Sequence, residues 1–237
     1  MRHAMAGSTG DIHDTDLIGL TSLNAIDWSI ANLEGIQYCV DLTELHLGVN
    51  EIVDISALAS LANLTKLYLD GNQIVDISPL SGLANLTKLR LDHNQIIDIS
   101  PLAGLTNLSA LHVGANEIVD INPLSGLTSL TVLTLYDNEV VDISPLSGLA
   151  NLSELWLYRN QIVDINALSG LTSLTKLNLA GNQISDIAPL VNNTGIDTDD
   201  KVDLSYNQLL LQPGSPDMLD IQALQGRGVD VEYIPQN

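Results

Sequence analysis

The sequence predicts an α/β solenoid: a right-handed superhelix with a concave parallel β-sheet and a convex side of 3₁₀ turns or extended chain. Two observations carry this prediction. An asparagine recurs every 22 residues, and the leucines around it keep one frame through seven consecutive copies of the 237-residue chain. Chance agreement of seven copies in phase is negligible. The asparagines are Asn50, Asn72, Asn94, Asn116, Asn138, Asn160 and Asn182.

Each copy begins with a strand. Between Leu64 and Leu69 the apolar residues alternate with Lys66 and Tyr68, which is the period of a strand with one buried face. Leu67 and Leu69 are therefore expected to point into the core, and Lys66 and Tyr68 to point outward. Strands of successive coils then pair in parallel, about 4.8 Å apart, and form one sheet.

The repeated asparagine follows the strand, where the chain turns away from the sheet. Its amide is expected to satisfy backbone groups of its own coil and of the next coil. The return arm begins with a segment such as Asp76–Leu80, in which Asp or Ser caps a short 3₁₀ turn and Pro fits the first turn. The arm is short for a full α-helix. The prolines at this place are Pro79, Pro101, Pro123, Pro145 and Pro189.

The phase of the repeat divides the chain into four segments. Both ends depart from the frame, as expected for coils that close a solenoid. The segments are a partial N-terminal cap at 1–19, a degenerate first repeat at 20–41, seven 22-residue repeats at 42–195, and an irregular repeat with a C-terminal cap at 196–237.

The two end segments contain further predicted elements. Trp28 takes the place of the asparagine in the degenerate repeat, and Cys39 falls on a leucine position, which predicts a buried thiol. Near the other end, 202–207 is expected to form a strand and turn after a three-residue insertion. The apolar spacing of 217–225 is helical, and 229–233 is the last predicted strand.

The repeat resembles the 22-residue, internalin-type subclass of bacterial leucine-rich repeat proteins. The resemblance rests on Asn-x-Ile-x-Asp-Ile-x-Pro-Leu after each strand and on Leu20–Asn24 at the start of the array, and it covers roughly 11–233. It implies a leucine-rich repeat solenoid preceded by a helical cap, of which the residues up to Ile12 match only the end. It also implies a secreted or cell-surface protein, although the chain shows no signal peptide and none of the family's cell-wall anchoring signals.

Composition excludes several classes of function. With 29 acidic and eight basic residues the formal charge is −21, which argues against nucleic acid and anionic membranes as partners. One cysteine leaves no intrachain disulfide and no Cys-rich zinc site, and no apolar run is long enough for membrane insertion. No Ser/His/Asp set, phosphate loop or zinc motif is present, so we expect no enzyme, cofactor or bound metal.

The acidity is unevenly distributed along the repeat. The third, fifth, seventh and eighth places of each copy are expected to face the concave side, and across seven copies they hold five basic and five acidic residues. The other positions carry 24 acids against three bases, which is the whole charge of −21. Because frame residues are committed to folding, we expect function to reside in the outward positions. The expected partner is a protein or a glycan bound on the concave face.

Two spots on this face are predicted to contact the partner, because aromatic residues and Arg are enriched at binding hot spots. The aromatic spot consists of Tyr136, Trp156, Tyr158 and Arg159. The polar spot consists of Tyr68, Lys88, Arg90 and Asp92 with His93, and His112 is a further candidate.

Other interpretations stay open at this point. A solenoid surface tolerates solvent-facing aromatics without a ligand, and an exposed strand edge at the N-terminal end would allow a scaffold that self-associates as a homodimer. His93, His112 and Asp92 on adjacent coils could hold a metal adventitiously. A row of aspartates at the start of the return arms could attract Ca²⁺, although capping explains the same residues. These are Asp54, Asp76, Asp98, Asp120, Asp142, Asp164 and Asp186.

Overall fold

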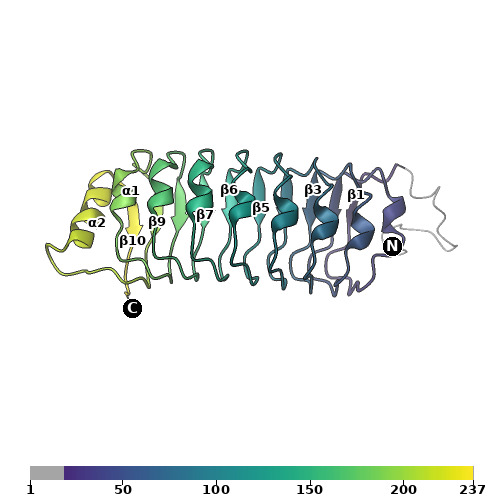
Figure 1. Cartoon of the computed structure of the whole chain (residues 1–237), viewed down its shortest axis with the longest axis horizontal. Helices are drawn as coiled ribbons and strands as arrows, with labels where there is room; N and C mark the ends of the chain where they lie inside the picture. Colours follow the sequence, from purple (N-terminus) through teal and green to yellow (C-terminus); the bar gives the residue numbers. More distant parts are fainter. Residues whose placement is uncertain (1–18, 237) are drawn as a thin grey trace.

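The computed structural model describes residues 19–236, which form one ten-stranded parallel sheet with its strands in chain order. This confirms the predicted solenoid, and Figure 1 shows the strands following one another along an elongated body. The partial cap expected at 1–19 lies, except for Gly19, outside the described residues. The strands are β1 (Ser22–Asn24), β2 (Glu44–His46), β3 (Lys66–Tyr68), β4 (Lys88–Arg90), β5 (Ala110–His112), β6 (Val132–Thr134), β7 (Glu154–Trp156), β8 (Lys176–Asn178), β9 (Lys201–Asp203) and β10 (Asp230–Glu232).

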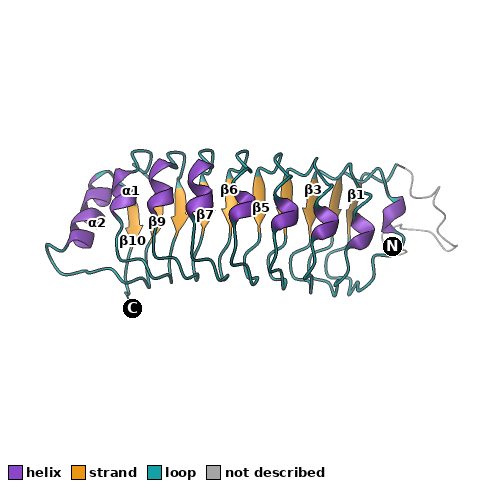
Figure 2. Ribbon diagram, viewed as in Figure 1, coloured by secondary structure: helices purple, strands orange, loops and turns teal. Residues whose placement is uncertain are grey.

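The return arms form a row of short helical turns on the other side of the coils (Figure 2). They are 3₁₀ turns in the coils of β1 to β7, as the length of the arm predicts, and a short α-helix takes their place after β8. The turns are η2 (Ile36–Tyr38), η3 (Ser56–Leu58), η4 (Ser78–Leu80), η5 (Ser100–Leu102), η6 (Asn122–Leu124), η7 (Ser144–Gly148) and η8 (Asn166–Gly170), and the helices are α1 (Ala188–Asn192) and α2 (Pro216–Gly226). None of the helices within residues 19–236 is long and apolar enough to cross a membrane.

The aspartate of each return arm caps the turn that follows it. The Asp76 carboxylate accepts the backbone N–H of Ser78 at 2.8 Å and the Ser78 hydroxyl at 3.0 Å, and Pro79 lies in the first turn of η4. The same bonds from Ser100 lower the pKa of Asp98. The capping role predicted for these residues is confirmed.

The repeated asparagines form a ladder through the core; we call the series from Asn50 to Asn182 the asparagine ladder. Asn72 Nδ2 donates to the carbonyls of Leu69 in its own coil and Leu47 in the preceding coil, both at 3.0 Å. Its Oδ1 accepts the N–H of Ile52 at 3.0 Å, also in the preceding coil. The expectation that the amide reaches the next coil is therefore wrong. The reason is geometric, because the equivalent groups of the Asn72 coil are occupied by Asn94.

The inward side chains of the strands and arms pack into one continuous core. Leu67, Leu69 and Leu80 are fully buried, and neighbouring coils place Leu, Ile or Val at the same positions. Burying such a side chain stabilises the fold by roughly 1.5–3 kcal/mol. Cys39 is fully buried as its register predicts, and burial raises the pKa of its thiol.

The last coils keep the ladder but change the return arm. β9 pairs with β8 so that Lys201 lies opposite Lys176, a step of 25 residues along the chain. Asn207 continues the ladder by accepting the N–H of Ile184 at 3.1 Å. The helix and strand expected near the C-terminus are present as α2 and β10, and α2 packs against α1 and β10.

A strained residue in the second coil provides a stability prediction. The residue before each ladder asparagine has a positive φ, and at Val49 that angle is 55°. A β-branched residue is unfavourable in this region, whereas glycine, as at Gly71 (φ 66°), adopts it freely. We expect Val49→Gly to raise the free energy of unfolding by about 1 kcal/mol, since Val49 is half exposed and loses little burial. Urea unfolding measures this, with Gly71→Val as the reverse change; a destabilised Val49→Gly protein would contradict it.

Candidate binding face

The parallel register aligns outward residues of successive strands into rows. Tyr68 lies opposite Arg90, and Arg90 lies opposite His112. We use the term concave face for the outward residues of β1–β10 together with the two residues that precede each ladder asparagine. Every residue predicted to bind a partner lies on this face, but the structure groups them differently from the two predicted spots.

The first group is an aromatic stack made by His93, Tyr136 and Tyr158. The rings of Tyr136 and Tyr158 are parallel within 5°, with centroids 4.8 Å apart. His93 meets Tyr136 edge-on at 6.1 Å, and its Nε2 lies 3.4 Å from the Tyr136 hydroxyl oxygen. These residues come from the turns that follow the strands. The stack therefore lies along the rim of the concave face.

Gly114 makes room for the stack. A Cβ atom added at Gly114 would lie 2.3 Å from Cε1 of the Tyr136 ring, so the ring lies directly over this glycine. Burial, reinforced by the negative charge of Asp92, raises the pKa of the Tyr136 hydroxyl above its ordinary value. Gly114 is not among the residues predicted from the sequence. The signal was a glycine one repeat before a tyrosine in the same place of the frame.

A buried polar cluster of Asp92, Thr134 and His112 adjoins the stack. Asp92 is only 9% exposed, and its Oδ1 accepts the Gly114 N–H at 3.0 Å and the Thr134 hydroxyl at 3.2 Å. Because Thr134 donates its proton to Asp92, its oxygen is left to accept from Nδ1 of His112, 3.4 Å away. Asp92 is thus hydrogen-bonded to Gly114 and Thr134. That it forms one binding spot with Tyr68 and Arg90 stays a prediction.

His112 gives the fold a specific pH dependence. Burial lowers the pKa of His112 below its ordinary value of 6.5, and the nearby Asp92 opposes this only partly. At a pH between the lowered pKa of the folded protein and the ordinary value of 6.5, the unfolded chain binds more protons than the folded chain, so stability falls as the pH drops through 6.5 toward that lowered pKa. We expect His112→Gln to flatten this slope in urea unfolding measured across that pH range. An unchanged slope would contradict the assignment, and His93→Gln, which alters an exposed histidine on the same face, is the control.

Three cations of the concave face are paired with acids of the preceding coil. Lys66 Nζ lies 3.1 Å from a Glu44 oxygen, Lys176 Nζ lies 2.8 Å from Glu154, and Arg159 lies 3.5 Å from Asp137. Such half-exposed pairs contribute about 0–1 kcal/mol each to stability, but they orient the side chains. Lys88 and Arg90 on β4 have no such ion pair within residues 19–236.

The second group lines a hollow that we call the cationic groove. It has a volume of about 530 Å³. The Tyr68 ring stacks on His46, with centroids 4.3 Å apart and planes within 12°. His112 joins this groove, whereas His93 belongs to the aromatic stack. The groove is lined by Ile26, His46, Tyr68, Asp70, Lys88, Arg90, Ala110, His112 and Val132.

Trp156 lies apart from both groups. It lines a hollow of about 250 Å³ with Asn178 and Lys201 from the next two strands. The predicted aromatic spot therefore divides into a tyrosine stack, a separate tryptophan and the Arg159–Asp137 pair.

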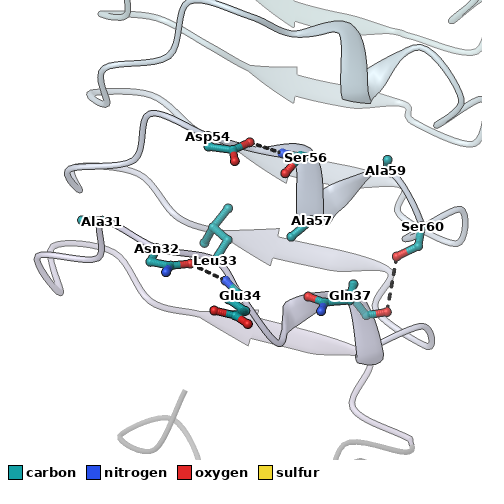
Figure 3. A pocket seen from close by; sticks show the side chains of 10 residues that line it. All are labelled: Ala31, Asn32, Leu33, Glu34, Gln37, Asp54, Ser56, Ala57, Ala59 and Ser60. Carbon is teal, nitrogen blue, oxygen red and sulfur yellow. Dashed lines mark hydrogen bonds between the residues drawn. The ribbon is translucent and has the colours of Figure 1, made fainter.

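Two further candidate sites within the described residues are a metal site and a hollow between the return arms. Within the described part of the chain, no three His, Cys, Asp or Glu residues are placed to hold a metal ion. A hollow of about 730 Å³ lies between the return arms of the degenerate first repeat and the first full repeat (Figure 3). Its Asn32 and Asp54 accept backbone N–H groups of their own turns at 2.7 and 2.8 Å. It has no aromatic or basic lining residue.

Comparison with known proteins identifies the class. Residues 40–82, 84–126, 128–170 and 150–192 match the family described as leucine-rich repeats in two copies. The chain therefore belongs to the leucine-rich repeat family, whose members are generally protein-binding modules and typically non-enzymatic. No curated protein sequence matches significantly.

The solved structures narrow the subclass. Internalin C2 of Listeria monocytogenes is 37% identical, with a TM-score of 0.76, over 84% of this chain and 84% of its own. The predicted internalin-type repeat is thus confirmed. A leucine-rich repeat protein of Leptospira interrogans shares the fold at 24% identity and a TM-score of 0.64, over 85% of this chain and 57% of its own. InlJ of Listeria monocytogenes also shares the fold, at 21% identity and a TM-score of 0.60, over 93% of this chain and 54% of its own.

Proposed function

We propose that this protein is a non-catalytic recognition module that binds a protein partner on its concave face. The observation that carries the proposal is the aromatic stack. Tyr136 and Tyr158 are fixed side by side over Gly114, and a pair of rigid aromatic rings buries a large area on binding at a small cost in side-chain entropy.

The charge distribution supports the same face. Across the seven regular repeats its acids and bases cancel, whereas the whole chain carries −21. A partner that approaches the concave face therefore meets ion pairs and rings, and a partner that approaches elsewhere meets an acidic surface. Neutral faces with aromatic anchors are typical of the centres of protein interfaces.

A change of one methyl group tests the proposal. Gly114→Ala places a Cβ where the Tyr136 ring lies, so the ring must move although every aromatic residue is kept. We expect a partner captured by the wild-type chain from host or environmental proteins to bind this variant at least about tenfold more weakly. A glycan array run in parallel identifies the alternative class of ligand. Gly126→Ala, which has open space around the new Cβ, is the control, and equal binding by both variants would remove the stack from the site.

Self-association through the N-terminal end is the second candidate. The first coils contain a small hollow of about 70 Å³ with an apolar lining that includes Leu23, Ala25 and Ile30. Sedimentation velocity over a range of concentrations tests this function, and a monomer at all concentrations would rule it out.

A further inference from the structure

The two cations of β4 have no ion pair within the described residues 19–236, because the sequence gives them no acidic neighbour in register. Lys66 and Lys176 each lie opposite a glutamate of the preceding strand, at Glu44 and Glu154. Lys88, in contrast, lies opposite Lys66 on one side and Ala110 on the other.

Arg90 is in the same situation. It lies between Tyr68 and His112, and burial favours the neutral form of His112. In a chain with 29 acids, two adjacent exposed cations without an ion pair leave a binding capacity that the fold itself does not use.

The residues lining the cationic groove limit which ligands Lys88 and Arg90 can bind. Its wall holds the Tyr68 ring, Ala110 and Val132, which offer apolar contact beside Lys88 and Arg90. The ring is held in place by His46, which itself is fixed by Glu44 at 2.9 Å. An Arg guanidinium recognises a carboxylate through two parallel hydrogen bonds, and the apolar wall suits an aliphatic side chain next to it.

Asp70 limits the negative charge that a ligand of this groove can carry. Its carboxylate lies in the same groove, about 3.2 Å from the position that a Cβ on Gly48 would take. One acid against two cations leaves a single positive charge, and the rest of the molecule is strongly acidic. A polyanion is therefore repelled, whereas one isolated carboxylate is not.

We infer that the cationic groove binds an acidic side chain of a peptide segment, with a neighbouring aliphatic side chain against Tyr68, Ala110 and Val132. This inference rests on the proposed function, because the segment would belong to the protein bound on the concave face. It adds the chemistry of the bound segment and places Lys88 and Arg90 as the residues that contact its carboxylate.

Synthetic peptides provide the test. Fluorescein-labelled peptides that carry a single Glu next to a Leu among otherwise uncharged residues are compared, by fluorescence anisotropy with the full chain, with the same peptides carrying Gln in place of that Glu. We expect the Glu peptide to bind at least about tenfold more tightly, and Lys88→Met with Arg90→Met to erase that preference. Asp70→Asn is expected to strengthen binding of the Glu peptide by about threefold, because it removes a repulsive charge. Lys176→Met, which removes a paired cation from the same face, is the control and should keep the preference.

Two outcomes would overturn the inference. One is equal binding of the Glu and Gln peptides to the wild-type chain, and the other is an equal loss in Lys176→Met. Thermal unfolding of each variant shows whether it remains folded. The proposed function fails separately: if partner binding is insensitive to the aromatic stack while the Glu peptide still binds, the groove assignment stands alone. If the stack is required and the Glu preference is absent, the function stands without the groove.

Discussion

Asn138→Ala is expected to lower the free energy of unfolding by about 3–6 kcal/mol, the largest effect that we predict for a single side chain. Asn138 is 8% exposed, and its amide donates to the carbonyls of Val113, Leu135 and Tyr136 at 3.0–3.2 Å. Its Oδ1 accepts the N–H of Ile118 at 3.0 Å. Alanine removes all four bonds and leaves backbone groups of two coils unpaired in the interior, each at a cost of about 1–3 kcal/mol.

An exposed asparagine in the same region provides the control. Asn151 makes one hydrogen bond across the coils, to the carbonyl of Thr128 at 2.9 Å, and it lies on the surface. Urea unfolding of Asn138→Ala and Asn151→Ala should show a large loss for the first and a loss of about 1 kcal/mol or less for the second. Equal losses would mean that the asparagine ladder adds nothing beyond an ordinary surface hydrogen bond.

The ladder also bears on how cooperatively the solenoid unfolds. Each coil contacts only its neighbours, so coupling between halves of the molecule passes through each interface in turn. Asn138 bonds to the preceding coil through Val113 and Ile118. Breaking that interface is expected to lower the denaturant slope as well as the midpoint, because the two halves then unfold separately.

The fold could be predicted from the sequence because a repeat fixes register by itself. Once Leu67 and Leu69 are assigned to the core, the same alternation assigns the outward residues of every strand. The direction of the asparagine bonds could not be predicted, since the repeat looks the same toward the preceding and the following coil. Only the three-dimensional path shows that Asn72 reaches back to Leu47.

The candidate site could be predicted only as a set of residues. The direction of a side chain on the face depends on the space and the backbone groups that the neighbouring coil leaves free. The residue at one position of the sequence does not reveal these. Asp92 turns toward the bare N–H of Gly114, and Tyr136 leans over the same glycine. Gly114 thus binds Asp92 through its N–H and leaves room for the Tyr136 ring, which contacts His93.

Tyr136→Ala combined with Tyr158→Ala is expected to weaken partner binding by about 100-fold or more while the chain stays folded. Both rings belong to turns after the strands and neither contributes to the buried apolar core, so their loss leaves the coil packing intact. What is lost is the pair of stacked rings, whose centroids lie 4.8 Å apart. Calorimetric titration with the captured partner measures the affinity, and far-ultraviolet circular dichroism with thermal unfolding establishes that the fold remains.

The control removes exposed apolar surface from the edge where the return arms begin. Val119 and Val141 are 51% and 49% exposed there, in successive coils. Val119→Ala combined with Val141→Ala should leave affinity within about twofold of the wild type, because scattered surface aliphatics contribute little outside an interface. If this control abolished binding and the tyrosine variant did not, the binding surface would be that edge. If both variants lost binding equally, truncation of any exposed apolar side chain would explain the result, and the aromatic stack would have no special role.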